Sequence, residues 1–314
     1  MQSSLNLQSW IKTDFYKRIA VGETVKTLAT AVFLLALFIG GFTIVQNGTA
    51  ALAGNDGYYH IKMGYLIRTE GLKPLFDYLP FTILNEQAYY DHHLLYHVWM
   101  ALFAPVDPVQ DGGIALQQGA KLASILMPSF AFLAIWWLFK TQKVPYPALF
   151  TVGGFALSSA FLYRMSMPRA QSLSLLLLVL GIHWLLQEKR WHLLILGFLY
   201  VWAYNAFPLL FVAAVVYFIA TLMTEQRWAW SMILFPTIGI ALGLIINPYF
   251  PENISFIVGH LAPKLGESTT KVGNEWNPYL TWTLVENSAG TLLFFLLGIL
   301  AIGWHNQRID KRTL

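Results

Sequence analysis

The chain has 314 residues, of which 56% are hydrophobic and 11% charged, and its mean hydropathy is +0.53. Soluble domains usually carry about 25% charged residues, so this composition excludes an ordinary soluble protein and favours an α-helical protein that crosses the membrane several times. The absence of cysteine excludes disulfides and thiolate metal sites. The net charge of +4 is informative mainly through where the charges lie along the chain.

Eight apolar segments are predicted to span the membrane, because they approach or exceed the roughly 18–20 residues that a spanning helix needs. The first follows a basic N-terminal stretch and is interpreted as a retained signal-anchor helix. The fifth and sixth predicted spans, which meet near residue 206, are separated only by a turn that contains Asn205 and Pro208. The predicted spans are about 28–46, 113–139, 146–163, 170–187, 191–205, 207–223, 229–247 and 288–305.

The charge distribution predicts which side of the membrane each connection faces. With a cytoplasmic N-terminus, the short inner segments hold twelve of the twenty basic residues, while eleven of the sixteen acidic residues lie elsewhere. An excess of Lys and Arg in short cytoplasmic segments is the pattern expected of membrane proteins. The sequence therefore predicts a multi-pass integral membrane protein with its N-terminus in the cytoplasm.

Two connections, at about 47–112 and 248–287, are too long to be simple turns, and both are predicted to face the outer side. Within the first, "HLLYHVWMALFAP" (93–105) is apolar but too short to span, so it is predicted to be an interfacial or re-entrant helix. The whole chain, 1–314, is predicted to form one transmembrane domain without a C-terminal soluble domain.

Polar residues concentrate in the first of these connections. Asp56 and His60 are four residues apart, as are His93 and His97, so each pair would share a face of a helix. Asp91, His92 and His93 are consecutive, and carboxylate with imidazole suits a divalent metal such as Mn, Mg or Zn. The alternative is that Asp56 caps the helix that follows it and the histidines only pack at the interface.

Further charged residues lie near the predicted outer ends of spans. Arg164 and Arg169 could bind a phosphate through paired hydrogen bonds, or reach lipid headgroups. Lys121 lies inside the second predicted span, where a lysine either marks a site or extends to the interface. In "KVGNEWNPYLTW" (271–282), Glu275 is the only carboxylate, and Trp276 could stack on a sugar ring or anchor at the interface.

Several of these motifs resemble the GT-C superfamily of membrane glycosyltransferases, in particular the catalytic subunits of oligosaccharyltransferases and their bacterial relatives that use polyprenyl-phosphate sugars. The resemblance is carried by "NDGYYH" (55–60) directly after the first span and by the following motifs, which are Asp91-His92-His93, "PRAQSLSLL" (168–176) and "VWAYNAF" (201–207). It implies a long first outer loop with short helices along the membrane, and it implies that Asp56 is the catalytic carboxylate. The chain differs in having no large C-terminal soluble domain and in having "NAF" where many bacterial members have a histidine after the asparagine.

The resemblance implies that a sugar is transferred from a polyprenyl-phosphate or diphosphate donor to an acceptor on the outer face, with inversion. The expected catalytic residues are Asp56, His60 and Asp91. The expected substrate-binding residues are Tyr58, Tyr59, Arg164, Arg169, Glu275 and Trp276. The expected metal ligands are Asp56, Asp91, His92 and His93, with Mn or Mg as the cofactor.

The expected partners are the lipid-linked sugar donor, membrane lipid and a further membrane protein, with no role for nucleic acid. Two other classes stay open on the sequence. A transporter or channel would keep its polar residues near the bilayer midplane, whereas the polar residues here collect in loops at one surface, which favours an enzyme. A non-catalytic membrane subunit would tolerate the loss of Asp56 and His93.

Overall fold

The structure is a computed structural model that describes residues 2–76, 89–105, 113–265 and 280–305, with side chains within 21–76, 89–105, 113–259 and 280–301. Every regular element in these ranges is a helix, which confirms the predicted all-α class for the described residues. The helices are α1 (Gln2–Asn47), α2 (Asp56–Glu70), α3 (Leu94–Ala101), α4 (Ile114–Thr141), α5 (Pro147–Ala156), α6 (Ser159–Ser166), α7 (Gln171–Leu186), α8 (Arg190–Ala203), α9 (Pro208–Glu225), α10 (Ser231–Ile245), α11 (Glu252–Leu265) and α12 (Thr281–His305).

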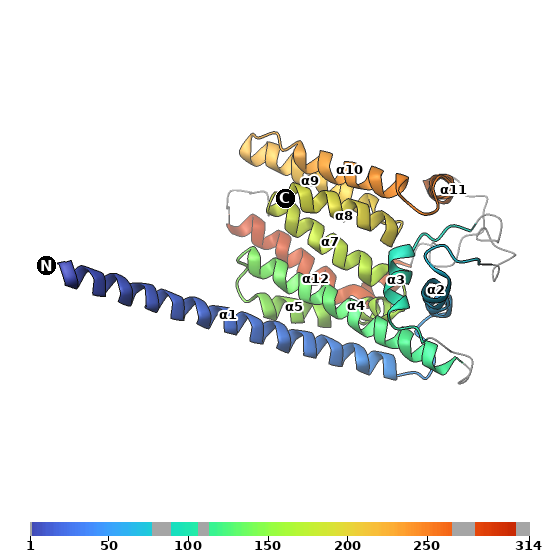
Figure 1. Cartoon of the computed structure of the whole chain (residues 1–314), viewed down its shortest axis with the longest axis horizontal. Coiled ribbons are helices and arrows are strands. Elements are labelled where there is room, and N and C mark those ends of the chain that lie inside the picture. The colour runs from blue at the N-terminus through green and yellow to red at the C-terminus, as the bar shows by residue number, and fades with distance from the viewer. Residues whose placement is uncertain (1, 77–88, 106–112, 266–279, 306–314) are drawn as a thin grey trace.

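The longer helices run side by side, and α2, α3 and α11 gather at one end of them, as Figure 1 shows. The N-terminus lies beyond the opposite end. α1 packs on α4, α4 on α7 and α8 on α10, while α2 packs on α3. The first long connection of the sequence therefore contains two short helices, as predicted, and they cover one end of the bundle.

Four helical segments are long and apolar enough to cross a membrane, namely Val21–Asn47, Ile114–Thr141, Pro208–Glu225 and Thr281–Ala301. The predicted multi-pass membrane class is consistent with them. α7, α8 and α10 coincide with three further predicted spans but have only 16, 14 and 15 residues. At about 1.5 Å per residue they fall short of a hydrocarbon core of about 30 Å, so the predicted number of eight spans is not established.

The predicted span at 146–163 is a broken one. α5 and α6 meet at an angle of 87°, and only as a pair do they count as a fifth possible span. Ser158 forms the break, because its hydroxyl accepts a hydrogen bond from the backbone N–H of Phe161 (3.2 Å) and so caps α6. The same hydroxyl donates to the carbonyl of Asn287 (2.9 Å), beside the non-helical residue Ser288 of α12.

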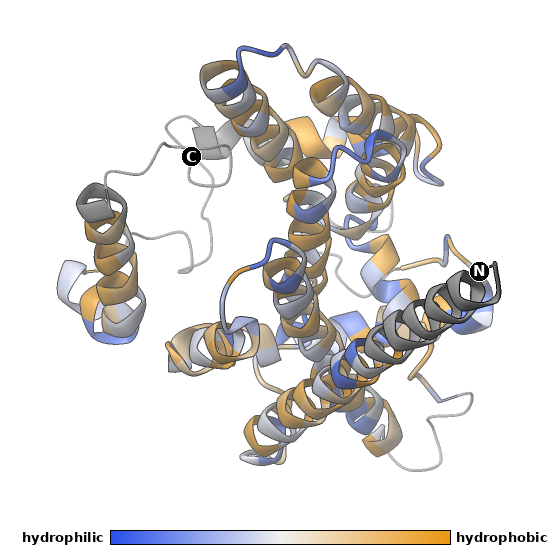
Figure 2. Cartoon of the chain, turned by 90° about the vertical axis from the view of Figure 1, so that its left-hand side faces the viewer, coloured by the Kyte–Doolittle hydropathy of each residue, from blue (hydrophilic) through white to orange (hydrophobic). Residues whose placement is uncertain are grey.

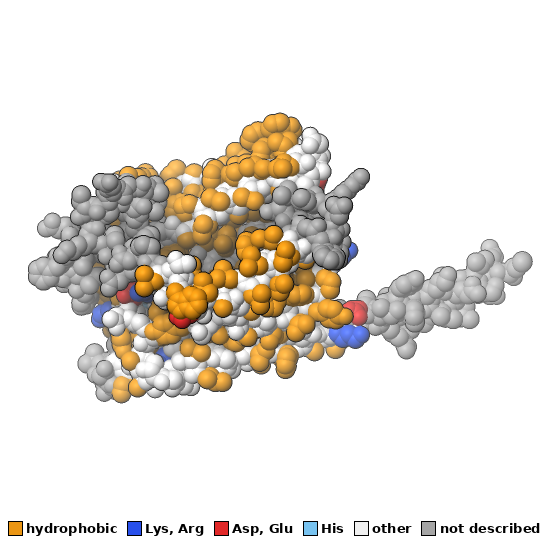
Figure 3. Space-filling model, turned by 180° about the vertical axis from the view of Figure 1, so that it is seen from behind, with side chains coloured by type: hydrophobic (Ala, Val, Ile, Leu, Met, Phe, Trp, Pro, Cys, Tyr) orange, Lys and Arg blue, Asp and Glu red, His pale blue; other side chains and the backbone are white. Residues whose placement is uncertain are grey.

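The outside of the bundle is apolar. Figure 2, viewed from one end of the long helices, shows orange hydrophobic residues along the helices and blue hydrophilic ones mostly in connections and helix ends. Figure 3 shows hydrophobic side chains over the middle of the visible face, with most of the charged side chains toward its two ends. Helix α12, for example, exposes Leu293, Phe295 and Leu300. An apolar belt of this kind is the surface that lipid chains would contact.

Lys121 of α4 holds the end of α1. Its ammonium group donates to the carbonyl oxygens of Gln46 (3.0 Å) and Thr49 (2.6 Å), where α1 runs out and its last carbonyls lack helical partners. The side-chain amide of Gln117, one turn earlier on α4, donates to the carbonyl of Ala50. Lys121, which lies inside a predicted span, therefore connects α4 to the end of α1.

Replacing Lys121 by methionine should weaken this junction. The Lys121→Met variant loses charge-assisted hydrogen bonds to α1, so we expect the free energy of unfolding to fall by about 1.5–3 kcal/mol. Denaturant-induced unfolding of the purified protein in detergent measures this. Lys26→Met is the control, because Lys26 is exposed and pairs only with Glu23 on its own helix in the described contacts, so its loss should cost less than about 0.5 kcal/mol. Equal stability of the two variants would contradict the structural role of Lys121.

Candidate functional site

Asp56 is the first residue of α2 and forms an ion pair with Arg169. The alternative in which Asp56 caps this helix does not hold, because the helix begins at Asp56 itself and the cap position is Asn55, without a side-chain hydrogen bond. An Asp56 carboxylate oxygen lies 2.5 Å from a guanidinium nitrogen of Arg169. The Asp56 side chain is 52% exposed and that of Arg169 only 16%, so the carboxylate faces the open side of the pair.

The approach of α2 to the turn before α7 makes this ion pair possible. A side chain at Gly57 would overlap with the ring of Pro168, so only glycine lets the first turn of α2 lie against Pro168. Arg169 follows Pro168 directly, at the turn between α6 and α7. Asp56 and Arg169, far apart in the sequence, thus meet because their neighbours Gly57 and Pro168, one small and one rigid, pack against each other.

A second close approach joins α2 to α3. A Cβ atom at Gly64 would lie 2.8 Å from the Cβ of Met100 and 2.9 Å from the backbone nitrogen of Ala101. The two helices therefore pack almost backbone to backbone. One turn earlier on α2, this packing places His60 against His97 of α3, with 2.7 Å between Nδ1 of His60 and Nε2 of His97.

The hydrogen bonds of this contact continue to a buried carboxylate. Nδ1 of His97 lies 2.7 Å from Oδ2 of Asp91, and both side chains are 0% exposed. The other oxygen, Oδ1, accepts a hydrogen bond from the backbone N–H of His93 (2.9 Å), at the residue before α3 begins. Asp91 thereby fixes both the start of α3 and the orientation of the His97 ring.

The order of donors along this chain follows from the carboxylate. An ionised Asp91 only accepts hydrogen bonds, so Nδ1 of His97 carries the hydrogen, and Nε2 of a neutral His97 is then an acceptor. Nδ1 of His60 must donate to it, which leaves the lone pair of a neutral His60 on its Nε2. The result is a polarised chain from Asp91 through His97 to His60.

Burial favours the neutral imidazole at His60 and His93. It is the largest cause of a lowered pKa at both His60 and His93, and the neighbouring histidines and Arg169 lower both pKa values further. A neutral imidazole offers one lone pair, either to a hydrogen-bond donor or to a metal. Arg169 is thus the partner of Asp56 and also a positive charge near the two histidines.

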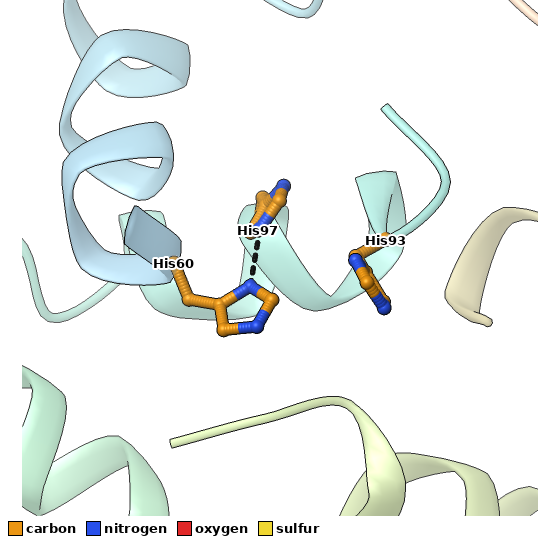
Figure 4. A group of neighbouring side chains, drawn as sticks. All are labelled: His60, His93 and His97. Atoms are coloured by element: carbon orange, nitrogen blue, oxygen red, sulfur yellow. Dashed lines mark hydrogen bonds between the residues drawn. The ribbon is translucent and has the colours of Figure 1, made fainter. Parts of the chain in front are cut away.

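His60, His93 and His97 form a group that could hold a metal ion, with one nitrogen from each ring lying within 4.8 Å of the others. Figure 4 shows the His60 ring of α2 beside His97 of α3, with the His93 ring at the start of α3. Nδ1 of His93 is buried and has no hydrogen-bond partner among the described residues. The ring of His93 stacks on Tyr204, with centroids 5.3 Å apart and planes at 19°.

Aromatic residues enclose the cluster. The hydroxyls of Tyr59 and Tyr89 lie 3.1 Å apart, and the Tyr59 ring stands edge-on to His97. Burial raises the pKa of Tyr59, Tyr89 and Tyr90, and the charge of Asp91 raises these values further. These phenols therefore stay protonated and can donate hydrogen bonds at neutral pH.

The structure brings together several of the residues that the sequence singled out. Asp56 and Arg169 pair directly, while His60, Asp91, His93 and Tyr59 belong to one cluster. Tyr58 is exposed, and its hydroxyl accepts from the backbone N–H of Leu52 (3.4 Å), so it supports the turn before α2. Glu275 and Trp276 lie outside the described residues.

The positions of Arg164 and His92, two other predicted site residues, are as follows. Arg164 is in the last turn of α6, and the ion pair with Asp56 is made by Arg169. His92 stacks on Phe256 of α11, with planes at 25°, and is not in the triad of possible ligands. The predicted metal set of Asp56, Asp91, His92 and His93 is therefore not the group that the described residues gather.

His97 is the member of the cluster that the sequence reasoning left out of the site. Its four-residue spacing from His93 was the available signal, because such a pair lies on one helical face. The turn from His93 to His97 is helical, with the N–H of His97 donating to the carbonyl of His93 (2.9 Å). Tyr89 and Tyr204 had no comparable signal, because their positions depend on how the connections fold.

No family model, curated protein or solved structure matches this chain. The likeness to membrane glycosyltransferases therefore rests on the motifs of the sequence.

The close packing of α2 on α3 can be tested at Gly64. In Gly64→Ala the added methyl meets backbone atoms of α3, so we expect the variant to lose about 1–3 kcal/mol of stability and to separate His60 from His97. Thermal unfolding in detergent measures the loss. Gly22→Ala is the matched control, because nothing lies within 4 Å of a Cβ there, and in a helix alanine should stabilise by about 0.5–1 kcal/mol. A neutral effect of Gly64→Ala would mean that the two helices are not in close contact.

Proposed function

We propose that this chain is a membrane glycosyltransferase of the GT-C type, which transfers a sugar from a polyprenyl-phosphate or polyprenyl-diphosphate donor to an acceptor at the outer face of the membrane. The observation that carries the proposal is the ion pair between Asp56 and Arg169, at the end of the bundle and beside a buried polar cluster. The likeness of "NDGYYH" (55–60) to the first outer loop of GT-C enzymes adds to it.

The position of the ion pair suits a lipid-borne substrate. Asp56 lies nine residues after the end of α1, and Arg169 lies two residues before the start of α7, so both stand where helices leave the bundle. A donor whose polyprenyl chain lies along the apolar outside of the helices would present its phosphate at this level. An arginine there can bind two phosphate oxygens through its planar fork.

The residue types support a single displacement. An acceptor O–H or N–H attacks the anomeric carbon of the sugar, and the bond from that carbon to the phosphate oxygen breaks with its electron pair going to the phosphate. The acceptor proton passes to the Asp56 carboxylate, while Arg169 leaves that carboxylate to stabilise the negative charge that develops on the phosphate. Attack from the face opposite the leaving group inverts the anomeric centre.

A carboxylate-bound Mn or Mg ion does not fit the residues as they lie. Such ions prefer several oxygen ligands, but both oxygens of Asp91 already accept hydrogen bonds and Asp56 is paired with Arg169. The proposed reaction therefore uses Arg169 for the phosphate charge, and no step depends on an oxygen-ligated metal.

The opposite end of the bundle supports the proposed orientation in the membrane. The turns after α4, α7 and α9 lie at the end nearer the N-terminus in Figure 1. These turns carry Lys143, Lys189 and Arg227. Short basic connections face the cytoplasm in most membrane proteins, so the N-terminus would be cytoplasmic and the Asp56 site would face outward.

The alternatives of a transporter and a non-catalytic subunit make different predictions. A transporter places its polar residues at broken helices near the midplane, whereas the polar cluster here lies on α2 and α3 at one end of the bundle. A non-catalytic subunit would keep its function without Asp56. Both alternatives are separated from an enzyme by measuring sugar transfer directly.

The assay begins with the lipid that co-purifies with the full chain, which mass spectrometry would identify as a sugar-bearing polyprenyl phosphate or diphosphate. Turnover is then the release of free polyprenyl phosphate or diphosphate from that donor in nanodiscs, with water as the acceptor of the sugar. We expect Asp56→Asn to lower turnover by about 100-fold or more, because the amide cannot take the proton. We expect Arg169→Lys to lower it as well, because an ammonium group lacks the guanidinium fork.

Glu188→Gln provides the matched control. Glu188 is also paired with an arginine, Arg227, but at the other end of the bundle, so this variant should transfer sugar at the wild-type rate. Full activity of Asp56→Asn would overturn the assignment of the catalytic carboxylate. Flux of a solute into proteoliposomes without any sugar-bearing lipid would favour the transporter class.

A further inference from the structure

The arrangement of His60, His93 and His97 has chemical properties that sugar transfer by Asp56 and Arg169 does not require. One ring comes from α2, one from α3 and one from the residue before α3, and Figure 4 shows His60 and His93 to either side of His97. Their possible ligand nitrogens lie within 4.8 Å of one another. In a tetrahedral zinc site, bonds of about 2.0–2.1 Å would place neighbouring ligand nitrogens roughly 3.3 Å apart, so modest ring movements would close this set around one ion.

Asp91 orients one of these rings in the way that metal sites use. A metal-bound histidine commonly donates its second N–H to a carboxylate, which fixes the tautomer and turns the other nitrogen toward the metal. Nδ1 of His97 donates to Asp91 over 2.7 Å, so Nε2 of His97 is the nitrogen that points to the other histidines. The Asp91 side chain is fully buried, so its oxygens are not hydrogen-bonded to bulk water.

His93 supplies a second, independent observation. Its Nδ1 is buried without a hydrogen-bond partner among the described residues, and a buried polar atom of this kind is costly in a folded protein. The backbone N–H of His93 donates a hydrogen bond to Asp91, and this bond fixes the backbone of His93 at the residue before α3. The residue thus combines a fixed backbone with a ring nitrogen available to a ligand.

We propose that His60, His93 and His97 bind a divalent transition-metal ion of the zinc class, with Asp91 as the positioning residue of His97. Imidazole nitrogens suit zinc, cobalt and nickel, whereas magnesium and manganese prefer oxygen ligands. The metal takes the place of the hydrogen that His60 and His97 share. The released hydrogen moves to the remaining nitrogen of the His60 ring, so that both facing nitrogens present lone pairs to the ion.

A site with three protein ligands has an open position for a water molecule or a substrate oxygen. An ion there would act as a Lewis acid on an oxygen bound at the open position. The inference concerns the binding of metal and stands without the sugar-transfer reaction, because metal content is measured on the protein alone.

The test uses the full chain purified in detergent, treated with a chelator and then dialysed against zinc or cobalt chloride. We expect about one zinc ion per chain by elemental mass spectrometry, and visible absorption bands of tetrahedral cobalt in the cobalt form. His60→Ala and His93→Ala should each abolish stoichiometric binding. His192→Ala, which removes a histidine on α8, should keep the ion and controls for non-specific binding to histidine.

His92→Ala separates the triad from the ligands suggested by the sequence. His92 is adjacent to His93 but stacks on Phe256, so we expect this variant to keep its zinc. Loss of zinc in His92→Ala, or unchanged binding in both His60→Ala and His93→Ala, would overturn the ligand set. Absence of any stoichiometric ion in the wild-type protein would show that the histidines form only a hydrogen-bonded relay.

Asp91→Asn tests the positioning role. Loss of a carboxylate behind a ligating histidine typically costs about 10–100-fold in metal affinity, so we expect zinc titrations to give a correspondingly weaker Kd at unchanged stoichiometry. If this buried variant does not fold, His93→Ala keeps the proposal testable, because His93 lies at the partly exposed start of α3. An unchanged Kd in folded Asp91→Asn would remove Asp91 from the site.

Discussion

The site depends on the direct packing of α2 on α3. At Gly64 the two helices approach so closely that the backbone of one lies against the other, and one turn away this approach brings His60 to His97. His60 reaches His97 only because no side chain separates the helices at this point. Asp91 then adds the hydrogen bonds that hold α3 in register, so backbone packing and the polar chain stabilise the same geometry.

The same constraint joins the two halves of the site. α2 lies between α3 and the turn before α7, and it presents a glycine to each side, at Gly64 and at Gly57. The Asp56 carboxylate therefore meets Arg169 at one end of the helix, while His60 meets His97 one turn further on. A single short helix outside the bundle carries both the proposed catalytic carboxylate and one of the proposed metal ligands.

Much of the fold could be predicted from the sequence because hydrophobic length is a strong signal in membrane proteins. Each predicted span coincides with a helix or with the broken pair α5 and α6, yet helix length depends on turns that hydropathy does not reveal. α8, for example, ends at Ala203, and α9 begins five residues later at Pro208. Spacing also pointed to His60, Asp91 and His93. The pairing of Asp56 with Arg169 could not be predicted from spacing, because it depends on the tertiary approach of α2 to α7.

The attachment of α1 to α4 through Lys121 has a mechanical consequence. Membranes of different thickness usually make helices tilt or slide relative to their neighbours. Because the end of α1 is fixed to α4 by Lys121 and Gln117, α1 cannot shift along α4 without breaking these contacts. A change in bilayer thickness would therefore tilt α1 and α4 together, and the height of Asp56 above the bundle would be set by the protein and not by the lipid.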